Sequence, residues 1–137
     1  MRRIVVAAKA GADQPWLADA AADLAHQTGA SVSVVSLDGL DVEALSPAPR
    51  SAFREPAEKT VNDLVARIAA AGVEAEGDVR PGLVTPGVLL YAEEKDADVI
   101  VCGASTKGKV ARRVLGSVPV ALIQRARRPV LVITPST

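Results

Sequence analysis

The sequence predicts an α/β fold of three layers, in which helices cover both faces of a doubly wound, five-stranded parallel sheet. Short runs rich in valine and isoleucine alternate along the chain with longer stretches rich in alanine and leucine. Right-handed crossovers leave few other arrangements for strands and helices that alternate in this way. With 137 residues, 49% of them hydrophobic, residues 1–137 have the size of one domain with a single sizeable core.

Five apolar runs of strand length are expected to form the sheet. Residues 3–8 are almost continuously apolar, which is typical of a parallel strand that is covered on both faces. The third run is more polar than the others. The strands are predicted at residues 3–8, 31–37, 73–80, 98–102 and 130–134.

Four helices are predicted between these strands, from helical spacing of apolar residues and from the residues at the helix ends. Pro15 suits a first helical turn, and Gly29 and Gly72 suit the position just past a helix end. Thr85 followed by Pro86 is typical of an N-cap and a first helical residue. The helices are therefore expected at residues 15–28, 56–71, 86–95 and 117–126.

The expected fold also indicates where a ligand binds. In a doubly wound sheet, ligands bind at the carboxyl ends of the strands, where the direction of winding reverses. The loops after the first, second and fourth strands are therefore the candidate binding region. Residues 38–55, which follow the second strand, contain two prolines and show neither period, so they are expected to form a long, partly ordered surface loop.

Composition and charge exclude several classes of protein. The 16 basic residues balance 16 acidic ones, and the high apolar content argues against a disordered or nucleic-acid-coating chain. The longest apolar runs fall far short of the ~20 residues that a membrane span needs. The first residues lack a signal-peptide pattern, so a cytoplasmic location is expected.

Catalytic and metal-binding constellations are also missing. One cysteine and one histidine rule out an intramolecular disulfide, a CxxC pair and a multi-histidine or multi-cysteine metal site. Cys102 ends an apolar strand, where a buried, inert thiol is expected, and His26 lies in a predicted helix without an identifiable partner. Nothing in the sequence therefore argues for an enzyme.

The most informative segment is residues 102–119, which follow an apolar strand and end at a helix start. Gly103 is expected to let the backbone turn sharply and approach a ligand. Gly116 and Ser117 place backbone N–H groups and a hydroxyl at a helix N-terminus, a combination that favours anions and above all phosphate. The alternative is that the two glycines shape loops and Ser117 caps the helix.

A P-loop is a second interpretation of the same segment. Residues 103–109 satisfy its G-x-x-x-x-G-K part, but Val110 stands where a serine or threonine would bind magnesium. Lys109 is also not clearly at the start of a long helix. An ATP-hydrolysing P-loop protein would depend on Lys109 rather than on Ser117.

The charge distribution favours an anion in this half of the chain. Residues 102–137 contain seven basic residues and no acidic one, a net charge of +7, whereas residues 1–101 have a net charge of −7. A basic block beside a glycine loop can pair with polyphosphate oxygens. A solvated basic face that keeps the domain in solution, or meets a partner, explains the block equally well.

The whole chain resembles the universal stress protein family in its βα pattern, its length and its loop spacing. Nucleotide-binding members carry G-x2-G-x9-G-[S/T] after the fourth strand, and Gly103, Gly116 and Ser117 occupy the first, third and last positions of that frame. The following Val118 and the closing residues 127–133 match as well. The resemblance implies a flavodoxin-like, Rossmann-like sheet with strand order 3-2-1-4-5 and a homodimer joined through the fifth strand. In one branch of the family it implies an adenine nucleotide bound between strands one and four.

The sequence departs from the nucleotide-binding pattern at two places. Thr106 replaces the second motif glycine; its Cβ disfavours positive φ, although its hydroxyl can donate one hydrogen bond. The loop after the first strand begins with Lys9, where such members usually have an aspartate that accepts hydrogen bonds from the nucleoside. Lys9 has only donors and either points at a phosphate or is a solvated loop residue. Asp13 is a substitute acceptor if the loop is reshaped, and Leu37 lies where the family packs an apolar residue on the base or simply belongs to the core.

Two hypotheses follow. The first is a universal stress protein-like domain that binds ATP, with magnesium, or AMP, or another phosphate-bearing ligand, with at most slow hydrolysis. Its site residues would be Gly103, Thr106, Gly116, Ser117, Val118, Lys9 and Leu37. The second is a dimeric interaction module without a ligand, which engages a partner protein. In either case a homodimer through Val130–Ile133 is expected, since this last strand would expose an edge that its own copy can cover.

Overall fold

The computed structural model describes residues 1–39, 50–104 and 115–135. Five strands form one parallel sheet in the order β3-β2-β1-β4-β5, as the family resemblance implies. The strands are β1 (Arg3–Ala7), β2 (Ser31–Leu37), β3 (Ala75–Arg80), β4 (Val99–Gly103) and β5 (Val130–Ile133). The helices are α1 (Pro15–Thr28), α2 (Arg50–Ala70), α3 (Val84–Glu94) and α4 (Ser117–Arg125).

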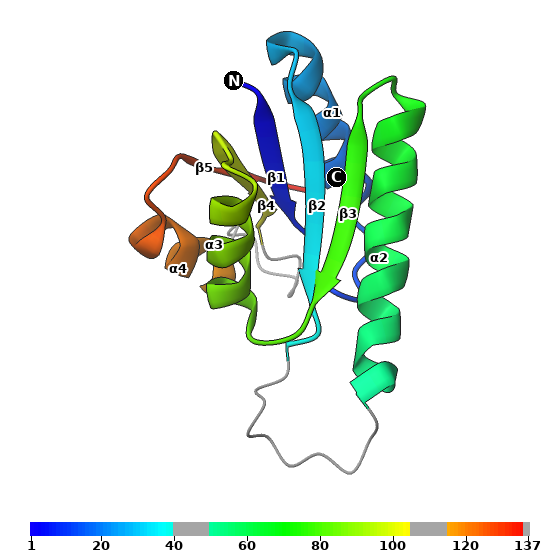
Figure 1. Ribbon diagram of the computed structural model, residues 1–137, viewed down its shortest axis with the longest axis vertical. Helices are drawn as coiled ribbons and strands as arrows, with labels where there is room; N and C mark the ends of the chain where they lie inside the picture. The colour runs from blue at the N-terminus through cyan, green and yellow to red at the C-terminus, as the bar shows by residue number, and fades with distance from the viewer. Residues whose placement is uncertain (40–49, 105–114, 136–137) are drawn as a thin grey trace.

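The sheet is the middle of three layers, with α1 and α2 on one face and α3 and α4 on the other (Figure 1). Side chains alternate between the faces along each central strand. Ile4 and Val6 of β1 face α1 and α2, whereas Val5 and Ala7 face α3 and α4. The near-continuous apolar runs of the central strands are therefore explained by burial on both faces.

Two predicted helix starts are wrong, and β3 begins at Ala75, two residues later than predicted. We expected a helix from residue 56, but α2 begins at Arg50 and contains Pro56, so residues 50–55 belong to a helix and not to a loop. Pro56 is exposed, and the Arg54–Glu58 ion pair, 2.8 Å from Nε to Oε1, spans it at helical spacing. Thr85 is not an N-cap, because α3 already begins at Val84.

The ends of the helices agree better with the sequence. Gly29 follows α1 in the left-handed conformation, at φ 74°, and its N–H donates to the carbonyl oxygen of Ala25 over 2.8 Å. Gly72 follows α2 with φ 86°. Both positions need a residue without a Cβ, which is the reason that glycine marks the ends of these helices.

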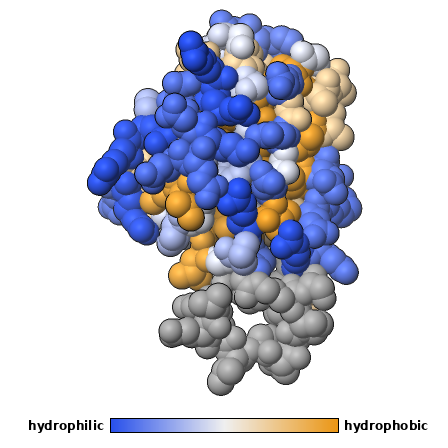
Figure 2. Space-filling view, viewed as in Figure 1, coloured by the Kyte–Doolittle hydropathy of each residue, from blue (hydrophilic) through white to orange (hydrophobic). Residues whose placement is uncertain are grey.

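Polar and apolar residues are distributed unevenly over the surface. Figure 2 shows hydrophobic residues reaching the surface within a mostly hydrophilic face. The exposed apolar side chains include Leu83, the N-cap of α3, and Leu90 within that helix. Val120 and Ile123 of α4 are exposed as well. No helix in the described ranges is long and apolar enough to cross a membrane.

Candidate functional site

The site lies at the carboxyl end of the sheet, where β1 and β4 run side by side. Ala7 of β1 pairs with Cys102 of β4, so the loops that follow these strands leave the sheet next to each other. From β1 the chain adds β2 and β3 on one side, and from β4 it adds β5 on the other. This is the point at which the winding reverses, and α1 and α4 begin beside it on opposite faces of the sheet.

The start of α4 supplies the clearest anion-binding geometry. Gly116 has φ 96° and ψ 162°, a conformation that is essentially restricted to glycine. No side chain caps the helix, and its first intrahelical bond runs from Val120 N to Gly116 O over 3.3 Å. The N–H groups of Ser117 and Val118 precede that bond, so helix geometry gives them no intrahelical acceptor. With the exposed Ser117 hydroxyl, they form the set of donors that the sequence predicts here.

Lys9 lies in the loop between β1 and α1, with an exposed side chain. Its N–H donates to Gln14 Oε1 over 3.3 Å, and its carbonyl oxygen accepts a bond from Ala12 N over 3.1 Å. Gly11 N donates to Thr60 Oγ1 of α2 over 2.9 Å, which fixes the middle of the loop. The backbone of this loop is therefore held in place, and the exposed Lys9 side chain lies at the carboxyl end of the sheet.

Leu37 belongs to the core between the sheet and α3. It is 3% exposed, and a Cβ added at Gly87 of α3 would lie 2.5 Å from its Cδ1. The close approach of α3 explains both the leucine and the facing glycine. Of the two interpretations of Leu37, core packing is the one that these contacts support.

Gly103 differs from the expectation of a sharp turn. It is the last residue of β4, pairs with Ile133 of β5 and lies outside the positive-φ region in which a glycine is required. A Cβ at this position would lie 2.5 Å from Cη2 of Trp16. Trp16 was not among the predicted site residues; the only signal for it is Pro15, which places the next residue in the first turn of α1, above the ends of β1 and β4.

Several predicted residues lie outside the described part of the chain. They are Thr106 of the glycine motif, Lys109 and Val110 of the P-loop match, and the basic residues Lys107, Arg112 and Arg113. Of the basic block, Arg125, Arg127 and Arg128 are described. Arg128 has a structural role, because its Nη1 donates to the carbonyl oxygens of Ala92 and Ala97 over 2.8 Å each.

The cysteine and the histidine have no features of a reactive site. Cys102 is buried, and burial raises the pKa of its thiol to about 11, so the thiol is protonated and inert at neutral pH. His26 Nε2 donates to Ala71 O over 2.7 Å, joining the end of α1 to the end of α2. Among the described residues, no cluster of three or more His, Cys, Asp or Glu side chains could hold a metal ion.

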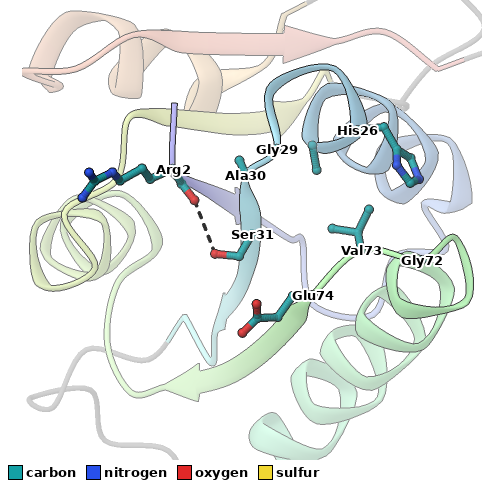
Figure 3. A pocket seen from close by; sticks show the side chains of 9 residues that line it. Arg2, His26, Gly29, Ala30, Ser31, Gly72, Val73 and Glu74 are labelled. Carbon is teal, nitrogen blue, oxygen red and sulfur yellow. Dashed lines mark hydrogen bonds between the residues drawn. The ribbon is translucent and has the colours of Figure 1, made fainter.

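Two concave regions lie away from the start of α4. One, of about 400 Å³, lies at the amino end of the sheet between Arg2, His26, Ser31 and Glu74 (Figure 3). The Ser31 hydroxyl there already donates to Arg2 O, and the Arg2 guanidinium points away from the hollow. The other, of about 640 Å³, lies between the β1–α1 loop and α2 and has three carboxylates against one ammonium, a poor environment for phosphate. Asp13, the substitute acceptor considered from the sequence, lines this second hollow and not the start of α4.

Fold and site together define a doubly wound α/β domain in which a helix without a side-chain cap begins beside the switch point. The model of the universal stress protein family matches residues 1–134, and the chain belongs to that family.

Solved structures agree with this assignment. A universal stress protein from Archaeoglobus fulgidus is 26% identical with a TM-score of 0.79, covering 97% of this chain and 98% of that one. A structure of the universal stress protein from the same organism in complex with dAMP is 27% identical with a TM-score of 0.74, covering 97% and 98%. A universal stress protein in complex with cAMP, 23% identical with a TM-score of 0.74 over 98% of both chains, shares the fold. No curated protein matches the chain.

Proposed function

We propose that this universal stress protein binds an adenine nucleotide, ATP with magnesium or AMP, or another phosphate-bearing ligand, at the carboxyl end of its sheet. The observation that carries the proposal is the start of α4, where the glycine-only conformation of Gly116 presents the N–H groups of Ser117 and Val118. A helix N-terminus of this kind attracts phosphate through its donors and its dipole. The A. fulgidus relative, 27% identical, was solved with dAMP, which supports the nucleotide class.

The residues of the proposed site have distinct roles. The two N–H groups and the Ser117 hydroxyl would donate to phosphate oxygens, and the Lys9 ammonium would add a charge at the same end of the sheet. Pro119, the third residue of α4, has no N–H, so the donors are concentrated in Ser117 and Val118. The proposal concerns binding, with at most slow hydrolysis. The cytoplasmic location expected from the sequence stays a prediction.

Calorimetric titration tests the proposal. We expect micromolar binding of AMP or magnesium-ATP by the wild type and a three- to tenfold weaker affinity for Ser117→Ala, because one hydrogen bond to a charged phosphate is lost. Ser31→Ala is the matched control, since Ser31 lies at the opposite end of the sheet. Absence of heat with both nucleotides, or equal losses in the two variants, would contradict the proposal.

A second candidate function is a dimeric interaction module, and the exposed β5 favours it. β5 is an edge strand of four apolar residues, and Leu131 is 40% exposed. Neighbouring α4 exposes Val120 and Ile123. An apolar edge strand is a template for pairing with another chain, and a second copy of β5 would cover it.

Sedimentation measures this second function separately from nucleotide binding. We expect a dimer at micromolar concentration and at least a tenfold higher dissociation constant for Leu131→Lys, because a charge on an edge strand opposes pairing. Leu90→Lys, on the exposed side of α3, is the control and leaves the dimer intact. A wild-type monomer at micromolar concentration would exclude pairing through Val130–Ile133.

A further inference from the structure

The reason why residue 103 is a glycine lies in its neighbours on α1. Its backbone is extended within β4, so a residue with a Cβ has no conformational cost there. The space is the constraint: a Cβ would lie 2.5 Å from Cη2 and 3.0 Å from Cζ3 of Trp16, and 3.1 Å from Nε2 of Gln14. Separations below 3.0 Å are not tolerated, so a larger residue requires that the indole or the strand end move.

Trp16 has little room to move. It is half-buried and packs against the core cluster between the sheet and the helices α1 and α2. The atoms nearest Gly103 belong to its rigid six-membered ring, which cannot bend away as a flexible chain can. A Cβ at residue 103 is therefore accommodated by a shift of the indole, of the first turn of α1 or of the end of β4.

The same turn also holds the loop that carries Lys9. The Gln14 side chain is 7% exposed and accepts a bond from Lys9 N through its Oε1. On the other side of Gly103, the N–H of the buried Ala104 donates to Ile133 O over 2.8 Å. Trp16 and Gln14 thus connect the end of β1 to the end of β4, the two strands between which the ligand is proposed to bind.

We propose that Trp16 is a positioning residue of the ligand site, and that Gly103 is a glycine because the indole, and not a phosphate, occupies the space of its side chain. The ligand in this inference rests on the proposed function, whereas the reason for the glycine does not. The glycine at position 103 thus has two competing explanations, a phosphate or Trp16 in the space of its side chain. If a phosphate needs the space, shortening Trp16 does not help a larger residue; if Trp16 needs it, shortening Trp16 does.

A double-mutant cycle on the full-length protein separates them. The variants are Gly103→Ala, Trp16→Phe and both together, each measured for melting temperature and for AMP affinity by calorimetry. We expect Gly103→Ala to lower the melting temperature by several degrees and to weaken AMP binding tenfold or more. We expect the double variant to regain both values to near those of Trp16→Phe alone, because phenylalanine lacks the far ring that meets the new Cβ.

Two further measurements control the cycle. Gly87→Ala creates a clash of the same 2.5 Å, with Leu37 on the other face of the sheet, so Trp16→Phe should not rescue it. Trp16 is the only tryptophan, so its emission should shift to longer wavelength in Gly103→Ala without any ligand. Lost AMP binding that Trp16→Phe fails to restore, or an unchanged melting temperature and emission in Gly103→Ala, would overturn the inference. If the wild type binds no AMP, the proposed function fails, and rescue of the melting temperature alone decides whether Trp16 explains the glycine.

Discussion

The two ends of the same sheet are built differently. At the amino end, the chain satisfies its own polar groups: Asp98 Oδ2 accepts bonds from Arg2 N over 2.6 Å and Arg3 N over 3.0 Å, and Arg128 binds two carbonyl oxygens. At the carboxyl end, α4 begins at Ser117, after Gly116 and without a side-chain cap, and Lys9 is exposed. The polar groups at the amino end stabilise the fold, whereas the proposed function assigns the exposed donors at the start of α4 to a ligand.

The largest expected effect is a loss of stability in Arg128→Ala, which tests the role of the amino end. Arg128→Ala leaves the carbonyl oxygens of Ala92 and Ala97 without their charged donor, and we expect a loss of about 2 kcal/mol in the free energy of unfolding. Urea unfolding measures it, with Arg127→Ala, an exposed neighbour, as the control. AMP affinity should stay within twofold of wild type. A stable Arg128→Ala protein with weakened AMP binding would reverse the roles of the two ends.

The next largest effect is a loss of AMP affinity in Gly116→Ala, which tests the role of the carboxyl end against a glycine at the amino end. Gly116→Ala forces a residue with a Cβ into a glycine-only conformation, so we expect the first turn of α4 to change and AMP affinity to fall tenfold or more. Gly29→Ala, at φ 74° with no neighbouring atom within 4 Å of the new Cβ, is the matched control at the amino end. It should cost about 1 kcal/mol of stability and leave AMP binding unchanged. Equal affinities of the two variants for AMP would argue against a site at α4.

Much of this architecture could be predicted from the sequence because local signals and the fold agree. Apolar runs located β1, β2, β4 and β5, whereas β3 is a polar segment that contains no apolar run. Gly29 and Gly72 located two helix ends, since each position needs a residue without a Cβ. The start of α2 was misplaced because Pro56 is typical of a first turn, whereas here the helix continues on its amino side.

The site was only partly predictable because some of its contacts join residues that are far apart in the sequence. The donors at Gly116 and Ser117 follow from local geometry at one helix start, so a sequence pattern contains them. The contact between Trp16 and Gly103 joins the first helix to the fourth strand, and no periodicity or spacing encodes such a pair. The turn expected at Gly103 was therefore wrong, although glycine is the correct residue for that space.

The smallest effect is a pH dependence at the amino end. The backbone N–H groups of Arg2 and Arg3 hold the pKa of the Asp98 carboxyl below its ordinary value. A lowered pKa in the folded state stabilises the protein above the ordinary pKa of about 4, and this contribution is lost as the pH falls through the lowered value. We expect Asp98→Asn to melt at a lower temperature than wild type at pH 7, with the two curves converging as the pH falls through the lowered pKa.

Asp23→Asn, on the exposed side of α1, is the control for that comparison. Its melting temperature should follow that of the wild type across the same pH range. A gap between wild type and Asp98→Asn that does not narrow on acidification would show that the two backbone bonds do not stabilise the amino end.

The most direct measurement is an amide NMR titration of the wild-type protein with AMP, which observes both ends of the sheet at once. A ligand at the carboxyl end predicts saturable shifts for Lys9, Ser117 and Val118 with little change at Gly29 and Gly72. Shifts confined to Gly29 and Gly72, or no shifts at millimolar AMP, would contradict the assignment of ligand binding to the carboxyl end.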